Sequence, residues 1–315
     1  MKKVLLTGAN GYIGSSTVKF LLNQGYFVHA VTSKPIVEKS SDNFIYHQAN
    51  LLSREETSAL IRKIRPTHLL HLAWYVEHRK FWNAVENLDW VQATLHLARE
   101  FIENGGERLV AAGTCAEYDW SKSGIYLESD FISTPHTFYG TAKHSVNLNL
   151  SKLTEKFGVS YGWGRIFFPF GKKEPADKLI PSITDSLLNN RRAEILRGNL
   201  ARDFMYIEDV AEAFVAFLES DVGGSVNIAT GEGVLVSEVA KIIAEILGKP
   251  ELLHFQHSDV PLNEPLKIVA DVSRLKNEVK WRKDFNIKES LEKSVGWYKR
   301  DNAKSCAEKE FFAEK

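Results

Sequence analysis

The sequence predicts an α/β protein built on a parallel sheet, with a smaller lobe towards its C-terminus. Short β-rich runs alternate with longer amphipathic stretches over the first half of the 315-residue chain, a pattern typical of βαβ units. The first β-rich run leads directly into 7-TGANGYIG-14, where glycine recurs at every third position. The alternation then breaks at 168-FPFGKKEPADKLIPS-182, which contains three prolines and a charge cluster. This break predicts an excursion away from the sheet.

The elements of the first half follow from periodicity and from their end signals. Ser53 and Glu56 form a capping-box pattern, and glycines follow the other helical stretches. The expected helices are Ile13–Asn23, Ser53–Lys63, Leu88–Glu103 and Thr137–Phe157. The expected strands are Lys3–Thr7, Phe27–Thr32, Phe44–Gln48, His68–Leu72, Arg108–Ala112 and Ser160–Arg165.

In the second half the alternation is weaker. Asp209 and Glu212 form another capping-box pattern at the start of an expected helix. The expected helices are Lys178–Asn190, Asp209–Ser220, Val234–Leu247 and Lys288–Lys299. The expected strands are Ala193–Leu196, Ser225–Ala229 and Leu252–Gln256. The last residues, 304-KSCAEKEFFAEK-315, indicate a surface helix or a frayed tail. We therefore expect a dinucleotide-binding domain over 1–167, rejoined by about 205–232, and a mainly substrate-binding lobe over 168–315.

Composition restricts the possible partners. The chain has 40 basic and 40 acidic side chains, so its balance of charge favours neither nucleic acid nor an anionic membrane. Its two cysteines, Cys115 and Cys306, lie far apart and predict neither a disulfide framework nor a metal site. No apolar run approaches the length of a bilayer span. We expect a cytoplasmic protein without a metal.

The glycine motif predicts a site for a dinucleotide. Gly8, Gly11 and Gly14 lie between a strand and a helix, where glycine permits a tight turn and lets a pyrophosphate approach the helix N-terminus. The expected fold is therefore a Rossmann-type, doubly wound parallel sheet. The second strand ends in 28-VHAVTSKP-35 without the acidic residue that would bind the ribose of NAD. Ser33 and Lys34 favour NADP, with NAD as the alternative.

A tyrosine and a lysine lie one helical turn apart in 138-FYGTAKHSV-146. Spacing by four residues places Tyr139 and Lys143 on one face of a helix. Tyr118 and Lys122 have the same spacing, so spacing alone does not identify the functional pair.

Several motifs, taken in their order along the chain, resemble the extended short-chain dehydrogenase/reductase family, in its nucleotide-sugar-modifying group. The resemblance covers nearly the whole chain and is carried by TGANGYIG, 70-LHLAW-74, Asn87, 111-AAGTCAEY-118, the YGTAK motif at 139–143, 202-RDFMYIEDVAEA-213, 271-DVSRLKNEVKW-281 and 290-SLEKSVGWYK-299. It implies a Thr, Tyr and Lys catalytic set at Thr114, Tyr139 and Lys143. It gives Tyr118 a packing role and Asn87 a structural one.

The resemblance also implies the remaining site residues. Lys143 is expected to hold the nicotinamide ribose, and Thr114 to orient the reacting oxygen. Expected cofactor-binding residues are Gly8, Asn10, Gly11, Tyr12, Ile13, Gly14, Ser33, Lys34, Asn50, Leu51, Leu72, Ala73, Tyr139 and Lys143. Expected substrate-binding residues are Thr114, Phe168, Lys178 and Arg202, with Arg197 a weaker candidate. The late phosphate-binding arginine of the family is missing, because Asn263, Glu264 and Lys267 occupy that region.

The reaction is predicted from departures from the family pattern. Dehydratases of the group carry Asp-Glu after the threonine, where this chain has Cys115 and Ala116, and Glu117 is one residue late. Phe168, Pro169 and Phe170 make the sugar pocket apolar. We expect an NADP(H)-dependent reductase of a nucleotide-activated 4-keto-6-deoxyhexose that forms a homodimer through the helices Leu88–Glu103 and Thr137–Phe157. The alternatives are a nucleotide-sugar 4-epimerase with tightly bound NAD, and a dinucleotide-binding redox sensor without catalysis.

Overall fold

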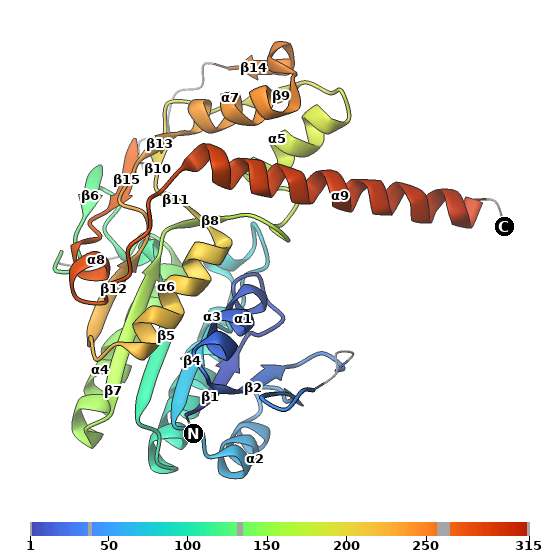
Figure 1. The fold of residues 1–315 in the computed structure, drawn as a ribbon. Coiled ribbons are helices and arrows are strands. Elements are labelled where there is room, and N and C mark those ends of the chain that lie inside the picture. The colour runs from blue at the N-terminus through green and yellow to red at the C-terminus, as the bar shows by residue number, and fades with distance from the viewer. Residues whose placement is uncertain (1, 37–39, 131–134, 257–264, 314–315) are drawn as a thin grey trace.

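The computed structural model describes residues 2–36, 40–130, 135–256 and 265–313, with side chains described as far as residue 301 (Figure 1). Its centre is a seven-stranded sheet in the order β12-β7-β5-β4-β1-β2-β3, and every pairing in it is parallel. These strands are β1 (Lys3–Thr7), β2 (Phe27–Thr32), β3 (Phe44–Gln48), β4 (His68–His71), β5 (Arg108–Thr114), β7 (Ser160–Ile166) and β12 (Gly224–Ile228).

The strand order reverses direction at β1. The chain first builds outward through β2 and β3, and then returns to the other side of β1 to add β4, β5, β7 and β12. A doubly wound sheet of this kind opens a crevice at the carboxyl ends of the strands where the order reverses. The predicted Rossmann-type fold is therefore confirmed, and its switch point lies between β1 and β4.

Helices cover both faces of the sheet, because neighbouring strand residues point to opposite sides. Val4 and Leu6 of β1 pack in one cluster with Leu21 and Phe214, from α1 (Gly14–Asn23) and α6 (Ile207–Glu219). Leu5 packs in the other cluster, with α2 (Arg54–Ile64), α3 (Glu86–Glu103) and α4 (Phe138–Phe157). Two apolar layers thus fix the positions of the strand ends.

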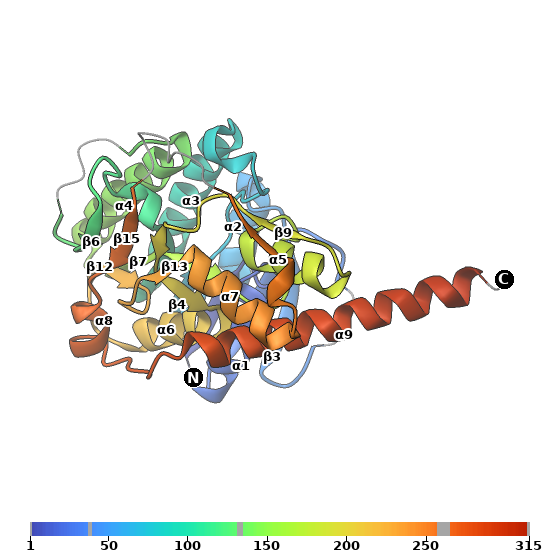
Figure 2. The same cartoon turned by 90° about the horizontal axis from the view of Figure 1, so that it is seen from above.

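A smaller lobe lies beyond the carboxyl ends of the strands (Figure 1). Its own apolar cluster joins α5 (Leu179–Leu188), α7 (Val236–Leu247), β9 (Ala193–Ile195) and the start of α9 (Ile287–Ala313). In both views the far end of α9 extends away from the rest of the molecule (Figure 2). Further short elements are β6 (Gly124–Tyr126), β8 (Phe168–Phe170), β10 (Ala201–Arg202), β11 (Phe204–Tyr206), β13 (Val234–Leu235), β14 (Leu253–Phe255), β15 (Lys267–Ala270), α8 (Ser273–Asn277) and the 3-10 turns η1 (Phe81–Asn83), η2 (Cys115–Glu117) and η3 (Pro250–Leu252).

Two sequence expectations are corrected in detail. Asp209 does not cap α6, because the helix already begins at Ile207, after the uncapped Tyr206. The Asp209 carboxylate pairs with Lys283. Ser53 does cap α2 by accepting a hydrogen bond from Glu56 N at 3.3 Å, but the Glu56 carboxylate reaches Asn50 N at 2.8 Å and not the serine. None of the helices in the described ranges combines the length and apolar character needed to cross a bilayer.

Candidate functional site

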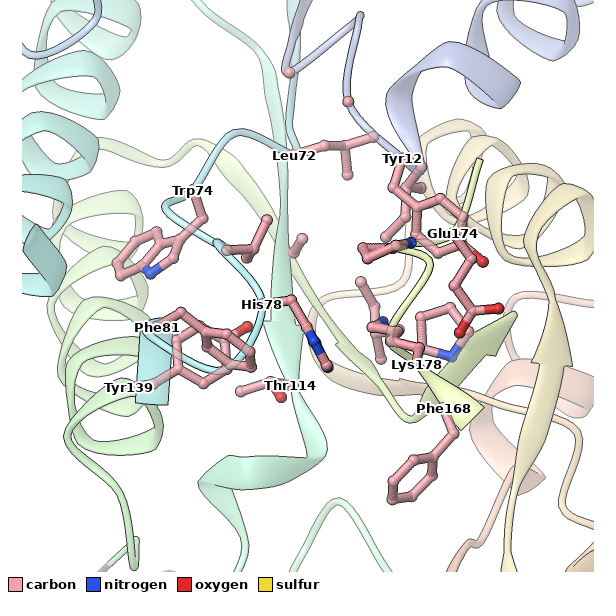
Figure 3. A pocket seen from close by; sticks show the side chains of 18 of the residues that line it. Tyr12, Leu72, Trp74, His78, Phe81, Thr114, Tyr139, Phe168, Glu174 and Lys178 are labelled. Carbon is pink, nitrogen blue, oxygen red and sulfur yellow. The ribbon is translucent and has the colours of Figure 1, made fainter. Parts of the chain in front are cut away.

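A cavity of about 1100 Å³ opens at the carboxyl ends of the central strands (Figure 3). The glycine loop after β1, the ends of β2, β4 and β5, and the start of α4 line one side. Residues of the small lobe line the other side. In the figure Trp74, Phe81 and Tyr139 lie across the cavity from Tyr12 and Lys178.

The glycine loop is packed too closely for larger residues. A Cβ atom at Gly14 would lie 2.0 Å from the Gly8 carbonyl oxygen. Gly8 itself has φ +69, and a Cβ there would lie 2.9 Å from Ala73 N in the segment after β4. The backbone of the loop therefore packs directly on neighbouring backbone where it enters α1. The N-terminal amides of α1 adjoin the cavity. Such a cradle fits the pyrophosphate of a dinucleotide.

Buried hydrogen bonds join the ends of β1 and β4 beneath this loop. The Thr7 hydroxyl lies 2.8 Å from His71 Nδ1 and accepts from the amides of Leu72 and Ala73 at 3.1 and 3.2 Å. Burial lowers the pKa of His71 to about 3, so this imidazole is neutral at physiological pH. The network holds the two strand ends in register at the switch point.

The end of β2 presents a hydroxyl and a cation to the cavity. Ser33 and Lys34 both line it and are exposed. Thr32, the last residue of β2, accepts hydrogen bonds from Asn10 Nδ2 at 3.3 Å and from Lys34 N at 3.1 Å. Among the residues that the structure describes, no carboxylate lines the cavity at this strand end. This edge therefore carries positive charge.

Thr114 ends β5 and turns the chain into η2. Its hydroxyl accepts from Ala116 N at 3.2 Å, and the Glu117 carboxylate accepts from Thr114 N at 2.9 Å. Glu117 is fully buried. Its carboxylate accepts a hydrogen bond from Trp163 Nε1 at 2.9 Å and forms an ion pair with Arg165 at 3.2 Å. Glu117 does not line the cavity, as its position in the sequence predicted.

Tyr139 and Lys143 lie on α4 and are both buried. Thr137 caps the helix by accepting from Gly140 N at 3.0 Å. A Cβ atom at Gly140 would lie 2.2 Å from the Ala116 carbonyl oxygen, so α4 packs directly on η2. This contact brings Tyr139 towards Thr114, the residue that ends β5.

Burial sets the charge state of Tyr139. It raises the pKa of the phenol, and the Thr114 hydroxyl opposes that rise. The Lys143 ammonium lies 3.8 Å from the centroid of the Trp74 ring. Tyr139 is a protonated phenol at neutral pH.

Aromatic rings surround the Tyr139 side chain. Phe81 and Trp82 meet it edge-to-face, with ring centroids 4.9 and 6.0 Å away, and Trp120 lies 6.1 Å from Trp82. Sequence reasoning missed this wall. The signal was the aromatic density of 74-WYVEHRKFWN-83, directly after the fourth strand.

The small lobe contributes the opposite wall. Arg202 is buried, lies 5.6 Å from the Phe168 ring, and donates to the Pro265 carbonyl at 3.0 Å. Lys178 is half-buried with its ammonium 5.6 Å from the Tyr12 ring. Glu174, which sequence reasoning missed, lies beside Lys178 (Figure 3), and burial raises its pKa to about 7.

A model of the NAD dependent epimerase/dehydratase family matches residues 4–229 of this chain. The chain belongs to this family. Relatives within the epimerase/dehydratase family act on nucleotide sugars, and the resemblance expected from the motifs is confirmed.

Three family members illustrate the range of similarity. A UDP-glucuronate 4-epimerase of Thermodesulfobacterium geofontis is 26% identical over 94% of this chain and 95% of its own length. A dTDP-4-dehydro-6-deoxyglucose reductase of Escherichia coli is 23% identical over 93% of this chain and 96% of its own length. The solved structure of MoeE5 with UDP-glucuronic acid and NAD is 26% identical, covers 95% of this chain and 99% of that one, and superposes with a TM-score of 0.78.

All of the cofactor and substrate candidates of the sequence analysis line this one cavity of the family fold. Their individual roles stay predictions. Two supporting roles are confirmed, since Tyr118 is buried and donates to Asn227 Oδ1 at 2.7 Å, and Asn87 donates to the Phe81 and Ala84 carbonyls at 2.8 and 2.9 Å. Asn263 and Glu264 lie outside the described residues.

Proposed function

We propose that this chain is an NADPH-dependent reductase of a nucleotide-activated 4-keto-6-deoxyhexose. The observation that carries the proposal is the aromatic wall around Tyr139, formed by Phe81 and Trp82 at centroid distances of 4.9 and 6.0 Å. An apolar wall favours a sugar whose carbon 6 is a methyl group over one whose carbon 6 carries a hydroxyl. The hydroxyl would lose its hydrogen bonds to water at such a wall.

The chain's own residues would supply the proton that the ketone oxygen gains. A nicotinamide dinucleotide, when bound along the glycine loop, supplies the hydride. Tyr139, protonated in this environment, donates its proton to the ketone oxygen as negative charge develops there. Thr114 would orient that oxygen, and Lys143 would bind the ribose next to it. Tyr139 then regains its proton from solvent, passed on by the polar side chains of Thr114 and Lys143.

The cofactor preference rests on the end of β2. Ser33 and Lys34 are exposed there, and neither they nor the adjacent Thr32 carries negative charge. A ribose 2′-phosphate is tolerated at such a site, whereas an acidic residue would repel it. The MoeE5 structure contains NAD, so NAD is the alternative cofactor.

Replacing Ser33 with aspartate is expected to reverse the preference. The new carboxylate would repel the 2′-phosphate and accept hydrogen bonds from a free ribose, so the ratio of NADPH to NADH affinity should fall by roughly 10- to 100-fold. Fluorescence titration of both reduced cofactors measures this ratio. Ser33→Asn, which keeps the size without the charge, is the matched control. An equal loss of both affinities in Ser33→Asp would contradict this placement of the ribose.

The proposed reaction is tested by mixing the protein with NADPH and a panel of nucleotide-activated 4-keto sugars that do or do not carry a hydroxyl at carbon 6. Loss of nicotinamide absorbance should be fastest with the 6-deoxy members. Reaction of only the 6-hydroxylated members would contradict the role given to the aromatic wall.

The second candidate is a nucleotide-sugar 4-epimerase, favoured by the similarity to the UDP-glucuronate 4-epimerase. Such an enzyme would retain NAD through purification and interconvert its substrates without added reductant. Chromatography of the nucleotide released on denaturation distinguishes the two, since the reductase should release little NAD.

Two organisational features remain proposals with the function. The first is the division into a dinucleotide-binding domain over 1–167, rejoined by about 205–232, and a mainly substrate-binding lobe over 168–315. The second is a homodimer through α3 and α4, whose surfaces expose Leu88, Leu148 and Phe157. Light scattering of the purified protein measures the mass that the second feature predicts.

A further inference from the structure

The Lys143 ammonium lies against the face of Trp74. Its Nζ atom is 3.8 Å from the Trp74 ring centroid and donates a hydrogen bond of 2.9 Å to the Ala112 carbonyl. Among the described residues no carboxylate lies within ion-pair distance of this ammonium. Its contacts there are the Trp74 ring face, one backbone oxygen and, at a greater distance, the Trp163 ring, whose centroid lies 5.9 Å from Nζ.

Trp74 itself is held rigidly. Its Nε1 donates to Asn87 Oδ1 at 2.9 Å, and Asn87 is fixed in turn by two backbone carbonyls. The ring is 9% exposed, packs on Trp90 at 6.2 Å, and meets Tyr139 edge-to-face at 6.5 Å. The segment after β4 thus presents a fixed aromatic face to α4.

The titratable groups around Lys143 leave its charge poorly supported. They are Tyr139 on its own helix, Cys115 and Glu117 after β5, and His71 at the end of β4. Glu117 is already bonded to Trp163 and Arg165. Burial lowers the pKa of Lys143 to about 7, so any contact that favours the ammonium decides its charge at neutral pH.

We propose that Trp74 is a positioning residue, whose ring face holds the Lys143 ammonium between α4 and β5. The negative face of an indole attracts a cation, and the attraction strengthens where water is excluded. The ring therefore keeps the lysine both charged and in place. The proposal rests on the proposed function only for the role of Lys143 in the reaction, since the contact can be tested without substrate.

The test is a pH titration of protein carrying ¹³C at the lysine ε-carbons, followed by NMR, with the Lys143 signal assigned from its loss in Lys143→Arg. In Trp74→Leu the midpoint for Lys143 should fall by about 1 pH unit, because the apolar side chain keeps water out but offers no ring face. Trp74→Phe should shift it less. Trp82→Leu, which alters the same cavity away from the ammonium, should not shift it.

A Lys143 midpoint that is unchanged or higher in Trp74→Leu would overturn the proposal. If the leucine variant fails to fold, as judged by circular dichroism, the phenylalanine variant and Asn87→Ala provide the same comparison, since the latter frees the indole from its anchor. With an active substrate in hand, the pH at which turnover falls should move with the NMR midpoint. If the proposed reaction is absent but the midpoint shifts, the positioning role stands and the function alone is wrong.

Discussion

Replacing Tyr139 with phenylalanine is expected to reduce turnover by roughly 10²- to 10⁴-fold, the range that a positioned general acid contributes. In the proposed reaction the phenol donates the proton, and burial keeps it protonated. Phenylalanine preserves the edge-to-face contacts with Phe81 and Trp82, so the cavity should keep its shape. Steady-state rates with NADPH and the best keto sugar measure the loss, and fluorescence titration should show nearly unchanged cofactor affinity.

Tyr118→Phe is the matched control for this experiment. That variant also loses one phenolic hydroxyl, which donates to Asn227 at 2.7 Å and accepts from Arg165 at 2.9 Å. The free energy of unfolding should fall by about 1–3 kcal/mol because a buried partner is left unpaired, with turnover per folded molecule largely kept. Loss of cofactor affinity in Tyr139→Phe, or equal losses of turnover in both variants, would contradict the assignment.

Replacing Gly14 with alanine is expected to abolish most dinucleotide binding. The new methyl group would lie 2.0 Å from the Gly8 carbonyl oxygen, a distance that forces the loop away from the start of α1. The amides that we propose to cradle the pyrophosphate would then separate. We expect at least a 100-fold loss of affinity, corresponding to about 2.7 kcal/mol, measured by fluorescence titration of NADPH.

Gly25→Ala controls for the general cost of replacing a glycine. Gly25 has φ +76 but no atoms within 4 Å of an added Cβ, so alanine there should cost about 1–2 kcal/mol of stability through backbone strain alone. Cofactor affinity should stay near that of the parent protein. Retained affinity in Gly14→Ala would mean that the dinucleotide binds elsewhere.

The central sheet and the glycine loop could be predicted because their signals are local. A strand, Gly8 to Gly14 and a helix follow one another directly in the sequence, and each of the first-half elements ends within a few residues of its expected position. Of the short strands of the second half, β9 and β14 were predicted, but β10, β11, β13 and β15 were not. β10 and β13 are each two residues long and exist only because distant segments pair with them.

The candidate site shows the same division. Thr114, Tyr139 and Lys143 were found from the family resemblance that the motifs carry, and the structure brings them to one cavity. The contact of Lys143 with Trp74 was not found, because it depends on how the segment after β4 folds back over α4. The raised pKa of Tyr139 was missed for a related reason, since burial depends on packing that spacing does not encode.

The most direct test of the account is to follow hydride and proton together. NADPH carrying deuterium at the hydride-donating carbon is incubated with a nucleotide-activated 4-keto-6-deoxyhexose and the protein, and the product is examined by NMR. Reduction by NADPH should place deuterium at carbon 4 of the sugar, on the carbon that bears the newly formed hydroxyl, and Tyr139→Phe should place almost none there. A 4-keto sugar recovered unreduced and unlabelled, with the NADPH not consumed, would contradict it.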